Sequence, residues 1–99
     1  MFIPKTLYLL LVLDRDWVQN RPAFTSYPFV IKHLERLKSC LSSQEHDEGV
    51  IALVQQAIKE SKKMYDVTIE ELKASSTAAQ ELQQLLSEIV EYVEKSGEV

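Results

Sequence analysis

Apolar residues recur at steps of three and four along most of this chain of 99 residues, a period typical of amphipathic α-helices. The pattern is clearest in the C-terminal segment. One face of a helix there would carry Ala78, Leu82, Leu85, Leu86, Ile89 and Val93. Thr77 and Gln80 have the spacing of a capping box, and Gly97 stands where a helix C-cap is expected. The pattern therefore predicts a helix from about Thr77 to Ser96.

Two segments in the middle of the chain show the same period. A helix that begins near Pro28 and ends near Ser42–Ser43 would carry Val30, Leu34, Leu37 and Leu41 on its apolar face. A third helix would begin near Asp47, which is a favourable N-cap residue. Its apolar face would carry Val50, Val54, Ala57, Ser61, Met64 and Thr68. We interpret the polar stretch from Ser42 to Glu48 as the connection between these two helices.

The boundary between the third and fourth helices is open to two interpretations. No Gly or Pro forces a break between Lys73 and Thr77. Residues 48–96 could therefore form a long helical hairpin, or one long helix of a coiled coil. We favour a turn at Ser75–Ser76, because two residues with little preference for helix precede the capping signal.

The N-terminal segment contains seven consecutive apolar residues, Leu7 to Leu13. Such a run is compatible with a helix or a buried strand, since its period does not distinguish them. Pro4 and the many leucines favour a helix from about Pro4 to Gln19. Its broad face would carry Leu7, Leu10, Leu11, Trp17 and Val18, whereas Leu9 and Leu13 would point elsewhere. A helix that is apolar nearly all round must be covered on more than one side, either within a bundle or by another chain.

Composition supports an all-α fold. Apolar residues make up 45% of the chain, and its two Gly and three Pro are too few for the many turns of an all-β protein. We predict a single helical domain over residues 1–99, folded as a small three- or four-helix bundle. The apolar run is far shorter than the ~20 residues of a membrane span, so we expect none. The single cysteine cannot form an intramolecular disulfide, and we expect a cytoplasmic protein.

The negative charge lies at one end of the chain. Residues 77–99 contain five Glu and one Lys, whereas the remaining residues carry ten charges of each sign, so the C-terminal segment accounts for the whole net charge of −4. Glu81, Glu88 and Glu91 lie opposite the apolar stripe, on a face open to water and to a basic partner. The basic cluster Lys59–Lys63 is interrupted by Glu60, so we expect no binding of nucleic acid.

Residues capable of catalysis or metal binding are few. His33 and Cys40 are seven residues apart, or about 10.5 Å along a helix, too far for a nucleophile–base pair. His46, Asp47 and Glu48 add possible ligands without the ordered spacing of a zinc site. We therefore predict no catalytic residue, no bound metal and no cofactor.

These features predict a non-enzymatic helical module that acts by protein–protein interaction and self-associates as a homodimer. A small antitoxin, immunity-type or adaptor protein is a more specific form of this hypothesis. The predicted partner surface comprises Trp17, Glu81, Glu88 and Glu91, since Trp is a common interface hot spot. The alternative is a carrier of an apolar small molecule or lipid, held in a bundle cavity lined by Leu7–Leu13 and Trp17.

Overall fold

The computed structural model describes residues 3–42, 48–66 and 76–95. Within these ranges lie the helices α1 (Lys5–Asn20), α2 (Tyr27–Ser42), α3 (Glu48–Asp66) and α5 (Ser76–Lys95), and one turn of 3₁₀-helix, η1 (Pro22–Phe24). The same ranges contain no β-strand. The all-α prediction is therefore confirmed.

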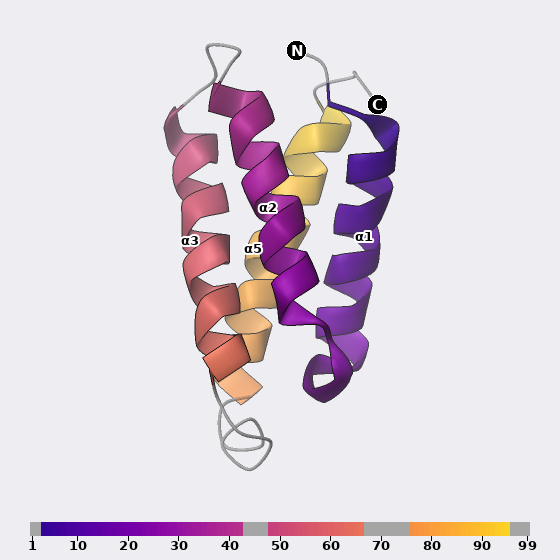
Figure 1. Cartoon of the computed structure of the whole chain (residues 1–99), viewed down its shortest axis with the longest axis vertical. Coiled ribbons are helices and arrows are strands. Elements are labelled where there is room, and N and C mark those ends of the chain that lie inside the picture. The colour runs from indigo at the N-terminus through magenta and orange to yellow at the C-terminus, as the bar shows by residue number, and fades with distance from the viewer. Residues whose placement is uncertain (1–2, 43–47, 67–75, 96–99) are drawn as a thin grey trace.

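The four described helices form an up-and-down bundle (Figure 1), in which each helix runs antiparallel to the one before it. α2 packs against α3, α3 against α5, and α5 against α1, while α1 makes a smaller contact with α2. These contacts close a ring around one core. The N-terminal end of α1 and the C-terminal end of α5 lie at the same end of the bundle. The predicted small helical bundle is confirmed, with four helices in the described ranges.

The last three helices contribute most of their predicted apolar stripes to the core. Their fully or nearly fully buried members are Val30, Leu34, Leu37 and Leu41 on α2, Val50, Val54, Ala57, Ser61 and Met64 on α3, and Leu82, Leu86, Ile89 and Val93 on α5. The Ser61 hydroxyl donates to the Ala57 carbonyl oxygen at 2.8 Å, so its burial leaves no unmet hydrogen bond. Each buried Leu, Ile or Val side chain contributes about 1.5–3 kcal/mol to stability.

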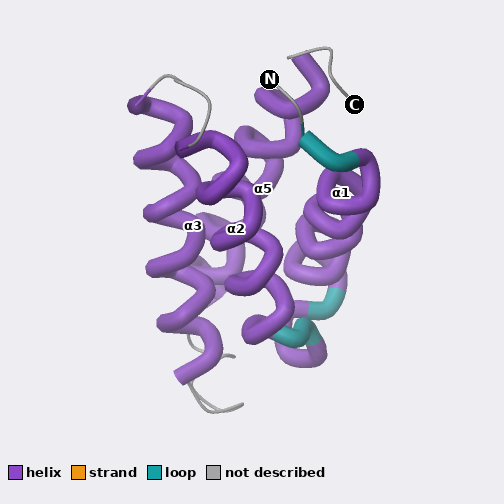
Figure 2. The backbone as a smooth tube through the Cα atoms, turned by 45° about the horizontal axis from the view of Figure 1, so that its top comes forward, coloured by secondary structure: helices purple, strands orange, loops and turns teal. Residues whose placement is uncertain are grey.

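α3 and α5 are two antiparallel helices that lie side by side (Figure 2). The alternative of a single long helix over residues 48–96 is therefore wrong, because one straight helix cannot pack against itself. α5 begins at Ser76, within one residue of the predicted start. The predicted cap at Asp47, the core position Thr68, the turn residue Ser75 and the C-cap Gly97 lie outside the described residues.

α1 resolves the choice between helix and strand for Leu7–Leu13, which is helical throughout. Its buried face consists of Leu7, Leu11, Asp14 and Val18, joined by Ile3 just before the helix. The predicted broad face is partly wrong. Leu10 is only half-buried and Trp17 is exposed, because each lies about 100° around the helix from the neighbouring core residue.

Two side-chain hydrogen bonds hold the connection from α1 to α2 in place. α1 extends through Asn20, one residue beyond the predicted end. The helix stops at Arg21, because a residue that precedes a proline disfavours helical backbone angles. Thr25 Oγ1 donates to the Arg21 carbonyl oxygen at 2.9 Å, and the Tyr27 hydroxyl donates to that of Pro22 at 2.6 Å. Burial raises the pKa of the Tyr27 phenol. These bonds fix the direction in which α2 leaves α1.

Candidate functional site

The first candidate surface lies on the outer side of α1, because its apolar run extends around the helix beyond the face that reaches the core. Leu7 and Leu11 are buried, whereas Leu9, Leu13 and Trp17 are 49%, 53% and 45% exposed. Residues four apart lie on the same side of a helix, so these three side chains form a continuous apolar line facing solvent. We name Leu9, Leu13 and Trp17 the α1 row.

Trp17, at the C-terminal end of the α1 row, is packed against Arg21. The Arg21 guanidinium lies 5.6 Å from the centroid of the indole, within cation–π range. An open hollow of about 160 Å³ is lined by both residues together with Leu13, Asp16 and Asn20. An aromatic ring already held in place loses little conformational freedom when a partner covers it, which is a property of interface hot spots.

Two hydrogen bonds fix the rotation of α1 about its own axis. The Tyr8 hydroxyl donates to Glu94 Oε1 on α5 at 2.7 Å, and this bond raises the pKa of Tyr8. On the opposite flank, Asp14 Oδ2 lies 2.6 Å from His33 Nδ1 on α2. At about 100° per residue, Tyr8 and Asp14 lie toward opposite edges of the buried face. Both bonds therefore hold the α1 row toward solvent.

The Asp14–His33 pair is a polar contact within the α1–α2 interface. Desolvation by burial raises the pKa of the Asp14 carboxyl above its ordinary value of 3.8, and the hydrogen bond and charge of His33 oppose part of that shift. The Phe29 ring stacks on His33, with centroids 6.3 Å apart. Cys40 stands two helical turns farther along α2 and packs at the edge of the core. It therefore does not complete a nucleophile–base pair with His33.

Aromatic residues are also exposed where the chain passes from α1 into α2. Phe24 in η1 is 80% exposed, and Phe29 in the first turn of α2 is 60% exposed. Exposed apolar surface of this kind marks interaction sites more often than single scattered side chains do. Tyr65, 61% exposed, lies on α3, which is not a principal neighbour of α1.

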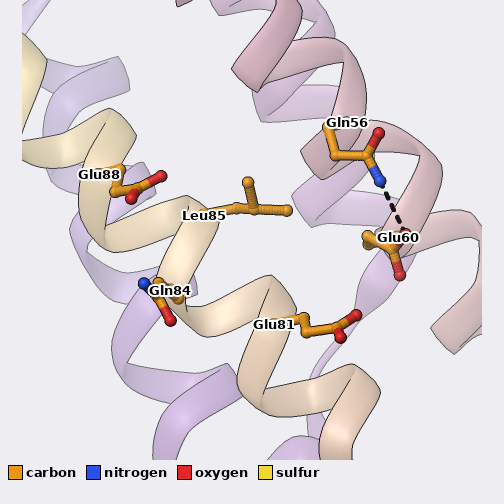
Figure 3. A pocket seen from close by; sticks show the side chains of 6 residues that line it. All are labelled: Gln56, Glu60, Glu81, Gln84, Leu85 and Glu88. Carbon is orange, nitrogen blue, oxygen red and sulfur yellow. Dashed lines mark hydrogen bonds between the residues drawn. The ribbon is translucent and has the colours of Figure 1, made fainter.

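The second candidate surface is an acidic groove between α3 and α5, with a volume of about 300 Å³ (Figure 3). It is lined by Gln56, Glu60, Glu81, Gln84, Leu85 and Glu88. In Figure 3 the side chains of Glu81 and Leu85 extend from α5 toward α3. The groove therefore combines three carboxyl groups, two amides and one apolar side chain, a set suited to a basic side chain with an aliphatic stem.

The predicted site residues do not form one site. Glu81 and Glu88 both line the acidic groove, because positions seven apart lie on the same side of α5. Glu91 lies outside the groove, and its Oε1 is 3.7 Å from Lys95 Nζ. Trp17 lies on α1, which does not line the groove. The two candidate surfaces are thus separate.

Glu60 is the acidic residue of the groove that the predicted partner surface did not include. It is only 5% exposed, and its Oε1 accepts hydrogen bonds from Gln56 Nε2 at 2.9 Å and Lys63 Nζ at 3.3 Å. One signal could have located it. Glu60 stands three residues after Ala57 and four before Met64, both of which are core positions, so it borders the apolar face of α3.

Groups of three or more His, Cys, Asp or Glu side chains placed to hold a metal ion do not occur in the described ranges. His46 and Asp47, considered as ligands from sequence, lie outside those ranges. No helix in the described part of the chain is long and apolar enough to cross a bilayer.

Comparisons with known proteins give no relative: neither a protein-family model, nor a curated protein, nor a solved structure matches this chain. Functional inference therefore rests on the residues and their arrangement.

Proposed function

We propose that this chain is a helical protein–protein interaction module that self-associates as a homodimer and has no catalytic activity of its own. The observation that carries this proposal is the α1 row. Leu9, Leu13 and Trp17 lie in one line, each about half exposed, although the core beneath them is filled by other residues of the same helix. A helix with an exposed line of apolar side chains, in addition to its core face, has a second apolar face that another protein chain can bury.

The acidic groove supports a second contact, with a basic segment of another protein. Glu81 and Glu88 face the groove opposite Glu60, and Leu85 gives it an apolar side. Electrostatic complementarity of this kind sets specificity and the rate of association more than affinity. An adaptor, or an antitoxin- or immunity-type neutraliser, would use the groove for its target while α1 holds the dimer together.

We also propose a cytoplasmic location. The single cysteine cannot form an intramolecular disulfide, and proteins without disulfides are typical of reducing compartments.

The alternative function, a carrier of an apolar ligand, has no such support. Its proposed lining residues face opposite directions, since Leu7 and Leu11 are buried whereas the α1 row points outward. A larger hollow of about 610 Å³ between α2 and α3 has one apolar lining residue, Ile58, beside five polar or charged ones. Carriers of apolar ligands use mostly apolar pockets.

Sedimentation velocity across protein concentrations from about 1 µM to 1 mM tests self-association. We expect the sedimentation coefficient to rise from the value of a monomer to that of a dimer as concentration increases. A monomer at every concentration would contradict the homodimer.

The second contact is tested by titrating a short Lys-rich peptide into isotope-labelled protein and following backbone amide shifts. We expect the shifts to concentrate at Gln56, Gln84 and Leu85 and to weaken with added salt. Shifts spread evenly over α5, Glu91 included, would indicate attraction to net charge without a defined groove.

A further inference from the structure

Resting on the proposed self-association, we propose that the partner of the α1 row is the α1 row of a second copy, paired antiparallel across a two-fold axis at Leu13. The first observation behind this arrangement is that the row is symmetric about Leu13. Leu9 and Trp17 stand four residues to either side of Leu13, about 6 Å along the helix axis in each direction.

A two-fold axis at Leu13 makes the row complementary to itself. The two Leu13 side chains meet at the axis, and Leu9 of one copy lies against Trp17 of the other. A large ring then packs against a smaller side chain at both ends of the row, as interdigitated helix interfaces require. Such an isologous contact closes as a dimer and leaves no free end for further growth.

The charges beside the row favour the antiparallel direction. At about 100° per residue, Lys5 and Asp16 fall on the same flank of the row. Antiparallel pairing brings Lys5 of one copy within about 7.5 Å, along the axis, of the level of Asp16 in the other. Parallel pairing would put the Lys5 flank of one copy on the opposite side of the interface from the Asp16 flank of the other, and it would align the two helix dipoles.

The area of the row suits the centre of a small interface. Three large side chains, each about half exposed, give apolar surface on the order of 300 Å², against roughly 800 Å² per partner in a standard interface. Half-buried Leu10 and the aliphatic stems of Lys5 and Arg21 border the row and extend it. Within α1 two acidic residues balance two basic ones, unlike the basic helices that lie on membrane surfaces.

Cysteine cross-linking tests this geometry in the full chain. In a Cys40→Ser background, Leu9→Cys, Leu13→Cys and Trp17→Cys are made singly, with Tyr65→Cys on α3 as the control for random collision. Each protein is oxidised at a concentration where sedimentation shows dimer, and disulfide dimers are counted on non-reducing gels. A disulfide needs Cα atoms within about 7 Å, whereas residues four positions from the axis are separated from their own copies by about 12 Å.

Leu13→Cys is expected to form at least tenfold more disulfide dimer than Leu9→Cys, Trp17→Cys or Tyr65→Cys. Strong cross-linking at all three α1 positions would overturn the antiparallel direction. If Leu13→Cys matches the Tyr65→Cys control while sedimentation still shows dimer, the interface lies elsewhere and only this inference fails. A monomer by sedimentation at every concentration removes the homodimer itself.

Discussion

Oδ2 of Asp14 lies 2.6 Å from Nδ1 of His33, and this contact joins α1 to α2 between residues nineteen apart in sequence. Both side chains are 12% exposed. An ionised carboxylate only accepts hydrogen bonds, so Nδ1 of His33 donates when Asp14 is charged. Because α1 contacts α2 less extensively than it contacts α5, we infer that this pair contributes to the placement of the α1 row.

The Asp14 carboxyl predicts a specific dependence of stability on pH. Burial raises the pKa of Asp14 above 3.8, so the folded chain binds this proton more tightly than the unfolded chain. As pH rises through the folded pKa, Asp14 therefore lowers the free energy of unfolding. Asp14→Asn removes this titration. We expect the stability of Asp14→Asn relative to wild type to increase as the pH rises above the ordinary carboxyl value of 3.8.

Urea denaturation at half-unit pH steps measures that difference. Asp16→Asn is the matched control, since Asp16 is exposed on the same helix. A difference that falls with rising pH would mean that the bond to His33 outweighs burial and holds the carboxyl in its charged form.

Removal of the imidazole should destabilise the bundle more than removal of a neighbouring exposed side chain. His33→Ala leaves the buried Asp14 carboxyl without its hydrogen-bond partner and removes the stacking surface of Phe29. We expect a loss of about 1–3 kcal/mol in the free energy of unfolding. Arg36→Ala, at an exposed position one turn along α2, should cost less than about 0.5 kcal/mol. Equal losses for the two variants would show that the pair adds little to stability.

The two sides of α1 should respond differently to the same truncation. Leu11 is fully buried, whereas Leu13, two residues away, is 53% exposed. Leu11→Ala is expected to cost about 2–5 kcal/mol, because it removes buried methyl groups and leaves a cavity. Leu13→Ala should change monomer stability by less than about 0.5 kcal/mol. The two losses are measured by thermal or chemical unfolding at a concentration low enough to keep the chain monomeric. A larger loss for Leu13→Ala than for Leu11→Ala would mean that α1 is rotated about its axis.

Sequence periodicity was sufficient for α2, α3 and α5, because each of these helices alternates apolar and polar positions. Leu34, Leu37, Leu82 and Leu86 could be assigned to the core for that reason, and all four are buried. For α1 the same method was only partly right. It placed Leu7 and Leu11 inward and Leu9 and Leu13 elsewhere, as observed, but it put Trp17 on the core face as well as in the partner surface. The seven consecutive apolar residues contain no polar position that limits the width of the core face.

The polar contacts of the candidate surfaces were beyond sequence analysis for another reason. Asp14 and His33 lie on different helices, as do Glu60 and Glu88, and spacing within one helix does not determine which faces of two helices meet. Glu81 and Glu88 were predicted to share a face with Glu91. The separation of Glu91 from the groove follows from where α3 packs against α5.

We expect the carboxylates that line the acidic groove to repel one another, whereas Glu91 lies outside the groove. Three carboxyl groups surround the groove, and Glu60 is nearly buried among them. Glu81→Gln combined with Glu88→Gln should raise the free energy of unfolding by about 0.2–0.5 kcal/mol per site at low salt. Glu91→Gln should lower it slightly, since Glu91 lies beside Lys95. Urea denaturation with and without about 1 M NaCl tests the origin of the effect, which screening should abolish.

The α1 row also predicts a change of oligomeric state from a single substitution. Leu13→Glu places a charge at the centre of the proposed interface, where two copies would bring two carboxylates together without water. We expect the dimer dissociation constant to rise by at least a hundredfold. The fold of the monomer should be unaffected, because Leu13 is 53% exposed.

Tyr65→Glu is the matched control for Leu13→Glu, since Tyr65 is similarly exposed on α3. Sedimentation velocity measures both constants, and circular dichroism at the same concentrations verifies the helix content. If Tyr65→Glu dissociates the dimer and Leu13→Glu does not, the chain associates through α3, and the line of Leu9, Leu13 and Trp17 has another role.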